Sequence, residues 1–178
     1  MVKPLRERYW LYRIRAHKDA KVFSELYHEH VARIHRFVLF KVGNEDDARE
    51  IVDDTFLKLW NHAVSGKPVT NLVGLLYTIA RAGCADHLRK RRFETVPLDA
   101  IAEPADGLAA SRLAANEELG ETLRAMERLK EEYREVLFMR HVDGLSTGEI
   151  AATIGKSNGT VRVLLYRAKN ALKDLLTK

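Results

Sequence analysis

The chain has one cysteine, Cys84, among its 178 residues, and this scarcity excludes several kinds of site. An internal disulfide cannot form, and no second thiol is present to complete a thiolate metal site. Apolar runs of about 18 residues are also missing, so we expect no membrane span, and the basic start has no run long enough for a signal peptide. We therefore expect a cytoplasmic protein in which Cys84 is buried or idle.

Alternating apolar and polar residues, the pattern of a half-buried strand, are missing too. The apolar spacing is helical instead, with stripes at 23–38, 48–59 and 75–88 and a loop predicted between Asn61 and Asn71. Proline, glycine and many alanines occur together after Phe93, which is typical of a linker. The sequence thus predicts an all-α protein with two small helical domains, 1–93 and 117–178, joined by a flexible linker at 94–116.

The segment LSTGEIAATIGKSNGTVRVLLYRAKNAL, residues 145–172, predicts two short helices with a tight turn between them. Ser146 and Glu149 form a capping box, Gly155 ends the first helix, and Ser157 can cap the second. This is the pattern of a helix-turn-helix, although a helical hairpin that only packs on its own domain would share it. The outer face of the second helix would carry Asn158, Thr160, Arg162, Val163, Tyr166 and Arg167.

The formal net charge of +5 favours a polyanionic partner, although proteins that bind no nucleic acid also reach this value. Basic residues near the start (Arg6, Arg8, Arg13, Arg15 and Lys18) could aid the approach to DNA. A solvated helix face explains them equally well. The position of the charges is therefore more informative than their sum.

Acidic and basic residues are segregated on the second and third predicted helices. The second opens with a run of carboxylates from Glu45 to Asp54, more than a helix amino end needs, and this face could dock a basic protein partner. The third ends in HLRKRR, residues 87–92, with Tyr77 and Arg81 upstream. Aromatic and basic groups on one helix suit a strand with unstacked bases. Two simpler alternatives remain, since cations favour a helix carboxyl end and Tyr77 could belong to the core.

Both halves resemble one family of bacterial proteins. The segments DDAREIVDDTFLKLW and LLYTIARAGCADHLRKRR resemble D-A-E-D-L-V-Q-E-x-F-L-x-x-W and W-L-Y-x-I-A-R-N-x-x-x-D-x-x-R-R of sigma factors of the extracytoplasmic-function (ECF) group. The segment from Arg134 to Leu172 resembles that family's R-E-V…G-L-S-x-x-E-I-A…G-T-V-K-S-R-L-x-R-A pattern. The resemblance covers about 19–92 and 117–176, and the order and spacing of the motifs make it specific.

This resemblance implies a non-enzymatic protein, without a cofactor, that binds core RNA polymerase and promoter DNA. A partner anti-sigma factor is also expected. The acidic helix would dock on polymerase through Asp46, Asp47, Glu50, Asp53, Asp54 and Lys58. The third helix would recognise and melt the -10 element through Tyr77, Arg81, His87, Arg89, Lys90 and Arg91. The carboxyl-terminal domain would read the -35 element through Ser157, Asn158, Thr160, Arg162, Val163, Tyr166 and Arg167.

Several positions depart from the family pattern. Leu75 and Ala82 stand where Trp and Asn are usual, so the loop at 61–71 or neighbouring residues would have to supply specificity at the -10 element. Arg49 replaces a usual Glu, and Lys130 stands where Pro is common. Val163 replaces a usual Ser on the outer face, where we expect it to meet a thymine methyl group.

Two other classes of protein fit part of the sequence. A helix-turn-helix regulator would bind duplex promoter DNA without polymerase, but it would usually carry a sensory or receiver half. A helical phosphohydrolase could hold magnesium on Glu50, Asp53 and Asp54, which share one helix face, yet no opposing carboxylate set is evident. His28, His30 and His35 do not supply one, because neighbours two apart on a helix point away from each other.

Overall fold

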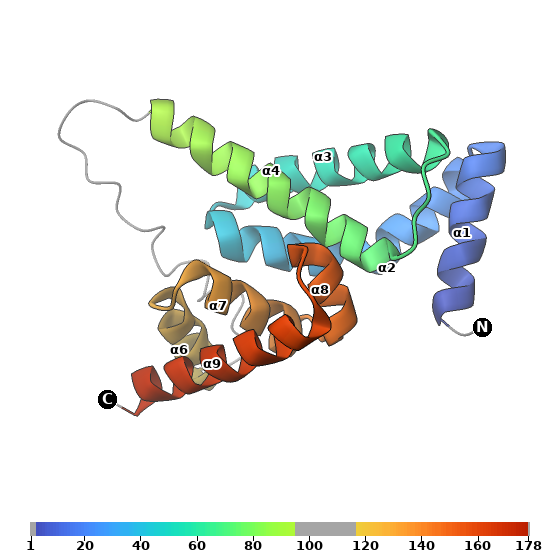
Figure 1. Cartoon of the computed structure of the whole chain (residues 1–178). Helices are drawn as coiled ribbons and strands as arrows, with labels where there is room; N and C mark the ends of the chain where they lie inside the picture. Colours follow the sequence, from blue (N-terminus) through green and yellow to red (C-terminus); the bar gives the residue numbers. More distant parts are fainter. Residues whose placement is uncertain (1–2, 95–116, 178) are drawn as a thin grey trace.

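The computed structural model describes residues 3–94 and 117–177, and every regular element in these two ranges is helical (Figure 1). The amino-terminal half contains α1 (Lys3–His17), α2 (Ala20–Val42), α3 (Glu45–Val64) and α4 (Leu72–Glu94). The carboxyl-terminal half contains α6 (Glu117–Glu127), α7 (Glu131–Leu137), the π-helix η1 (Phe138–Val142), α8 (Thr147–Ile154) and α9 (Asn158–Leu176). This confirms the predicted all-α class. Nearly all of the predicted linker at 94–116 lies outside the described residues.

The predicted helix caps are in place around the helix-turn-helix. Ser146 Oγ accepts a hydrogen bond from the Glu149 backbone N–H, and the Glu149 carboxylate accepts one from Ser146 N–H at 2.8 Å, which completes the capping box. Gly155 ends α8 with φ at +66°, a conformation that glycine adopts without strain. Ser157 caps α9 by accepting from Thr160 N–H at 3.1 Å. Local sequence therefore sets the bend between α8 and α9.

The amino-terminal half packs α2, α3 and α4 around a common apolar core, and α1 covers one end of it. Leu26, Ile34, Leu59 and Leu76 are fully buried in this core. From α1, Trp10 and Ile14 are buried, and the Trp10 indole N–H donates to a Glu25 carboxylate oxygen at 3.2 Å. The core thereby fixes which faces of α3 and α4 are left outside.

One predicted boundary is wrong. The loop expected from Asn61 begins only at Ser65, because Ala63 is buried and continues the apolar stripe of α3. The chain turns at Gly66, where φ is +79° and a side chain would be strained. Asn71 then accepts a hydrogen bond from Gly74 N–H at 2.9 Å at the start of α4.

The two halves pack against each other, which the sequence did not predict (Figure 1). Helices α4 and α8 approach so closely that a Cβ placed on Gly74 would lie 3.0 Å from the Ala152 Cβ. Phe138 of η1 is buried and stacks on Phe40 of α2, with the ring centroids 4.3 Å apart. A shared apolar contact therefore joins the halves, and it is flanked by charged groups.

Candidate nucleic-acid and protein-docking surfaces

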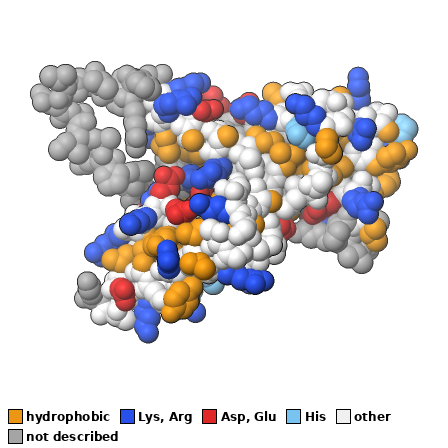
Figure 2. Space-filling view, viewed as in Figure 1, with side chains coloured by type: hydrophobic (Ala, Val, Ile, Leu, Met, Phe, Trp, Pro, Cys, Tyr) orange, Lys and Arg blue, Asp and Glu red, His pale blue; other side chains and the backbone are white. Residues whose placement is uncertain are grey.

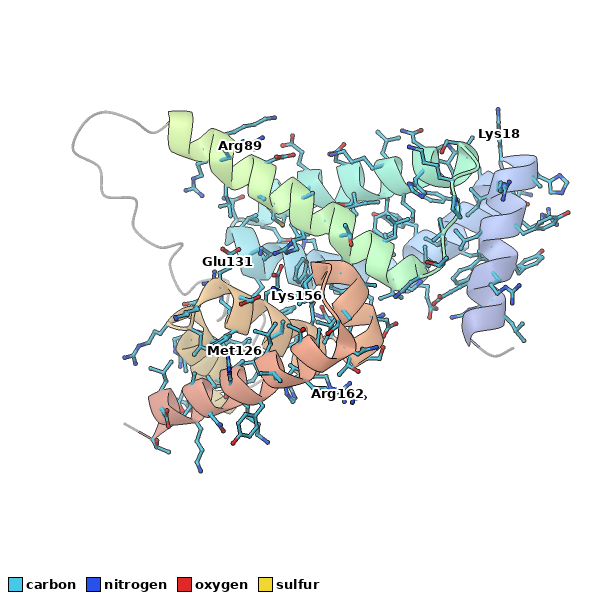
Figure 3. The ribbon with its side chains drawn as sticks, viewed as in Figure 1. Lys18, Arg89, Met126, Glu131, Lys156 and Arg162 are labelled. Carbon is cyan, nitrogen blue, oxygen red and sulfur yellow. The ribbon has the colours of Figure 1, made fainter. Side chains whose placement is uncertain are left out.

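The outer face of α9 is open to solvent. Val161, Leu164 and Ala168 are buried on the inner side, whereas Tyr166 and Val163 keep 70% and 48% of their surface exposed. Arg162 and Arg167 are exposed beside them, and Figure 3 shows Arg162 on the side of α9 away from the amino-terminal half. The face thus offers two guanidinium groups, a phenol and a branched methyl surface, a set that can donate to bases and meet thymine methyl groups.

The amino end of α9 is also exposed, but part of its hydrogen-bonding capacity is used locally. The Ser157 and Thr160 hydroxyl groups lie 2.9 Å apart and share a hydrogen bond. Asn158 is exposed next to them. The structure therefore brings all seven residues predicted for this face to one accessible end and side of a helix, with Ser157 acting as a cap as well.

The carboxylates of α3 differ in how far they are already paired. His35 lies 3.1 Å from Glu45, His87 lies 3.1 Å from Asp47, and Asp54 pairs with Lys58 at 2.6 Å. Arg49 sits 3.4 Å from Glu45 and reaches Asp46 only at 3.9 Å. Glu50 and Asp53 are exposed and make no ion pair within the described residues. These two are the carboxylates most available to a basic partner.

Tyr77, predicted to touch DNA, is fully buried where the two halves meet. Its hydroxyl donates to Asp143 Oδ2 at 2.7 Å. Burial, followed by the nearby Asp143 charge, raises the pKa of Tyr77 well above its usual value, so the phenol stays protonated and donates. In this arrangement Tyr77 cannot reach a base, as the core alternative anticipated. Its role in DNA contact remains a prediction that requires the halves to separate.

Asp143 is the centre of a polar cluster that spans the two halves. Arg36 of α2 donates to Asp143 Oδ1 from Nε at 3.2 Å and from Nη2 at 3.0 Å, and Arg33 donates to the Asp143 carbonyl oxygen at 2.8 Å. Burial raises the pKa of Asp143, while the Tyr77 hydrogen bond and the Arg36 charge oppose that rise. A buried carboxylate needs such partners. All of them come from the amino-terminal half, so the cluster forms only while the two halves pack against each other, an arrangement that we call the closed contact.

A second charged cluster lies nearby on the same junction. Arg81 Nε lies 2.9 and 3.1 Å from the two carboxylate oxygens of Glu135, and Lys41 joins Glu135 to Glu131. The Lys41 hydrogen bond lowers the pKa of Glu131. Side chains of both charges meet along this junction in Figure 2. The cluster borders a cavity of about 630 Å³ that Thr78, Ala82 and Ala85 of α4 also line.

The basic end of α4 is exposed to solvent. Arg89 pairs with Asp86 at 2.9 Å on the surface, and Lys90 and Arg91 are exposed. Half-buried His87 faces Asp47 of α3 instead of pointing outward. The six residues predicted for the -10 element are thus in three situations. Tyr77 and Arg81 contact the other half of the chain, and His87 faces the acidic helix α3. The other three, Arg89, Lys90 and Arg91, are exposed.

The clusters at Asp143 and Glu135 are what sequence reasoning missed. Asp143 lies beside Gly144 in what was predicted as a turn, and its partners are 66 and 107 residues away in sequence. Arg33 and Arg36, three residues apart on one side of α2, were the only local signal. The π-helix η1 directly precedes Asp143, and such turns are frequent at functional sites.

The remaining sequence predictions concern thiol, metal and membrane chemistry. Cys84 is buried, and burial raises its pKa to about 12, as expected of an idle thiol. Within the described ranges, His, Cys, Asp and Glu side chains do not gather into any group of three or more that could hold a metal ion. None of the described helices is both long and apolar enough to cross a membrane.

Comparison with known proteins assigns the family. Residues 26–94 match Sigma-70 region 2, and residues 119–172 match Sigma-70, region 4. The chain is 31% identical over 158 residues to the ECF RNA polymerase sigma factor SigL of Mycobacterium tuberculosis, covering 87% of this chain and 89% of SigL. It is 31% identical over 160 residues to SigE of Mycolicibacterium smegmatis, covering 88% of this chain and 62% of SigE.

Solved structures give the same fold. CnrH, in complex with the cytosolic domain of CnrY, aligns over 97% of both chains with a TM-score of 0.74 and 23% identity. The sigma factor RpoE of Bartonella quintana, in complex with the anti-sigma factor NepR, aligns over 89% of this chain and 98% of RpoE with a TM-score of 0.68 and 26% identity. Together with the sequence matches, these findings place the chain in the family of ECF RNA polymerase sigma factors.

Proposed function

We propose that the protein binds core RNA polymerase and directs it to promoters by reading the -10 and -35 elements. The observation that carries this proposal is the presence of two accessible surfaces on one chain. The outer face of α9 can read duplex DNA, and the carboxylates of α3 can dock a basic protein. A DNA reader with its own docking surface suits an initiation factor better than a regulator that acts alone.

Docking on polymerase is assigned to the acidic face of α3. Among the predicted set of Asp46, Asp47, Glu50, Asp53, Asp54 and Lys58, we expect Glu50 and Asp53 to contribute most. Neither must leave an internal ion pair before it can meet a basic partner. Asp47 and Asp54 contribute less in this scheme, because His87 and Lys58 already lie beside them.

Reading of the -35 element is assigned to α9 and the -10 element to α4. Arg162 can bind guanine bidentately, and Val163 can meet a thymine methyl group in the major groove. On α4, the exposed Arg89, Lys90 and Arg91 would meet phosphates, whereas Tyr77 and Arg81 would first have to leave Asp143 and Glu135. Melting would involve no covalent chemistry, since captured bases offset part of the cost of opening the duplex.

The proposed division of labour requires two units that can move apart. Residues 1–93 would form the docking and melting unit, 117–178 the -35 unit, and 94–116 the linker between them. Because the closed contact buries Tyr77, promoter opening would follow separation of the units. This work would take place in the bacterial cytoplasm, where the polymerase is found. RpoE of Bartonella quintana forms a complex with NepR, and we expect a comparable protein inhibitor here.

Run-off transcription with core polymerase and a pool of promoter fragments tests the proposal. We expect new transcripts whose start sites share paired upstream elements, and we expect Asp53→Arg to remove them. Lys173→Glu, an exposed charge change at the far end of α9, is the control. The proposal fails if core polymerase gains no new starts while the protein alone protects duplex DNA, which would indicate a regulator without polymerase docking.

A further inference from the structure

One face of α1 and the loop after α3 enclose a hollow that the proposed function leaves unused. Leu11 and Tyr12 of α1 line it, and Arg8 and Arg15 lie three or four residues before and after them, so all four share one side of the helix. Lys67, Pro68 and Val69 of the loop line the hollow together with them, as does Ala63 at the end of α3. We call this hollow, of about 310 Å³, the α1 groove.

The α1 groove carries positive charge that the protein does not neutralise. Arg6 and Arg13 also lie on α1, but they pair with Glu29 and Asp19. By contrast, Arg8, Arg15 and Lys67 make no ion pair within the described part of the chain, and no acidic residue lines the groove. The four arginines of α1 thus divide into two that are paired within the protein and two that are available to an anion.

The loop side of the groove is held firmly in place. Ser65 Oγ donates to the His62 carbonyl oxygen at 2.8 Å, and Asn71 Oδ1 accepts from Gly74 N–H at 2.9 Å, so both ends of the loop are tied to helices. The Arg15 guanidinium lies against the turn, with Nε 3.7 Å from the position a Gly66 Cβ would take. The groove is therefore formed before any ligand arrives, which lowers the entropic cost of binding.

An exposed aromatic ring stands at the groove and indicates which anion would fit. Tyr12 lines the groove and keeps 63% of its surface exposed. Cations beside an accessible aromatic ring suit single-stranded nucleic acid, whose phosphates need neutralising and whose bases are free to stack. A duplex would offer its phosphates but not the faces of its bases.

The position of the groove connects it to the helix assigned to the -10 element. In Figure 1 the loop between α3 and α4 runs beside α1, and Figure 2 shows blue and orange side chains together at that end of the molecule. The loop leads directly into α4, so a strand that follows α4 past Tyr77 would reach the groove. Helix α1 precedes residue 26, where the match to Sigma-70 region 2 begins.

We propose that the α1 groove binds one nucleotide of single-stranded DNA, with its phosphate between Arg8, Arg15 and Lys67 and its base against Tyr12. This inference rests on the proposed function, because the promoter supplies a single strand only once it is melted. The groove would act as an additional hold on the open strand, beyond the end of α4.

Binding of the complete holoenzyme to a promoter with a premelted bubble tests the phosphate contacts. The variant Arg8→Ala/Arg15→Ala should flatten the slope of log affinity against log salt by about 0.7, since the groove holds one phosphate and each single-strand phosphate contact contributes about 0.7. Lys18→Ala/Lys21→Ala is the matched control. It removes two positive charges from exposed positions on neighbouring parts of the chain and should leave the slope unchanged.

A second pair of variants tests the base contact. Tyr12→Ala should weaken bubble binding about tenfold, because stacking of one base on an aromatic ring is lost. Tyr9→Ala is the control, since Tyr9 is an exposed tyrosine of the same helix that does not line the groove. Neither variant should alter binding to the fully duplex -35 half of the promoter.

The outcomes separate this inference from the proposed function. If wild-type holoenzyme does not bind the bubble or initiate, the proposed function fails. If it does, but the groove variants bind the bubble like their controls, the groove does not contact DNA. If they lower affinity for core polymerase and leave bubble binding by the docked complex unchanged, the groove takes an acidic protein segment, which also overturns the inference.

Discussion

The two helices assigned to DNA reading, α9 and α4, present their polar faces in opposite ways. The outer face of α9 is open, with Arg162 and Tyr166 exposed and without internal partners in the described residues. On α4, Tyr77 is buried on Asp143 and Arg81 lies on Glu135, both groups supplied by the other half of the chain. The far end of α4, around Arg89, is exposed, although Arg89 pairs with Asp86 there.

This difference suggests an order of events. A helix that reads duplex DNA can be ready from the start, because its site exists before binding. A helix that captures unstacked bases is needed only after docking, and its closure would keep a basic surface off other nucleic acid. The acidic face of α3 is open in the closed contact, so docking on polymerase can come first.

The largest effect should come from locking α4 against α8. In Gly74→Cys/Ala152→Cys the two Cβ atoms would start 3.0 Å apart, about 0.5 Å below the usual disulfide range. The nearby Asn71 amide would have to shift slightly. Oxidised protein should lose promoter opening by roughly 100-fold, because the crosslink holds Tyr77 in the junction, and reduction should restore it. Permanganate footprinting of the melted region measures this.

The single variant Ala152→Cys is the control for the crosslink, and it should respond to neither oxidant nor reductant. Buried Cys84 is not expected to compete for pairing. Equal promoter opening by the oxidised and reduced double variant would show that the closed contact does not limit access to α4.

The next effect should come from the open face of α9. Arg162→Ala should weaken binding of holoenzyme to its -35 element by about tenfold or more, since one bidentate guanine contact is lost. Thermal stability should change little, because Arg162 is exposed and makes no hydrogen bond or ion pair within the described residues. Competition binding with single-base promoter variants measures the loss, with Lys173→Ala, about three turns further along the helix, as an exposed control. A uniform loss across all sequences would reassign Arg162 to phosphate.

Val163 allows a finer test on the same face. Val163→Ser should reduce discrimination at one thymine of the -35 element by several-fold, because the methyl contact disappears. The same competition assay reports it. Unchanged discrimination at every thymine would exclude the assigned contact.

A smaller effect should follow from loosening the closed contact. Tyr77→Phe keeps the ring but removes the hydroxyl that donates to Asp143. This loss should destabilise the closed contact by about 1–3 kcal/mol. The free protein should then bind a single-stranded -10 oligonucleotide several-fold more tightly than wild type, as measured by fluorescence anisotropy. Tyr133→Phe on α7, a half-buried tyrosine away from Asp143, should have no such effect. Weaker binding by Tyr77→Phe would mean that the Tyr77 hydroxyl itself contacts the DNA.

The smallest effect concerns Cys84 on α4. Because burial raises its pKa to about 12, roughly one thiol in ten thousand is ionised at pH 8. A thiol reagent should therefore react with the folded protein at a negligible rate and with denatured protein at the ordinary rate. The thiol ionises less readily in the folded than in the unfolded protein. Cys84 therefore lowers the free energy of unfolding as the pH rises from about 8.5 towards 12, and it has no such effect at lower pH. Rapid labelling of folded protein would show that α4 is loosely packed.

The helices, their caps and the open faces could be predicted because they depend on residues close in sequence. Ser146 and Glu149 specify the start of α8, and the apolar stripe of α9 determines that Arg162 and Tyr166 point outward. The acidic start of α3 was readable for the same reason. The boundary at Asn61 was misplaced because the buried Ala63, a tertiary contact, extends α3 to Val64.

The junction between the halves could not be predicted. Asp143 is indistinguishable in sequence from an ordinary turn residue, and its role comes from Tyr77 and Arg36 on distant helices. Gly74 carries no pattern that would reveal α8 beside it. From the sequence, Tyr77 could be either a DNA contact or a core residue. In the closed contact it is fully buried, as a core residue would be.

Pulsed electron paramagnetic resonance on spin labels at Asp86→Cys in α4 and Glu121→Cys in α6 tests the separation of the halves most directly. Both positions are exposed, and the native thiol is buried. We predict one narrow distance in the free protein and a clearly longer one in the promoter-bound holoenzyme. The same narrow distance in a transcribing complex would contradict the account, because Tyr77 would then remain closed while the promoter is open.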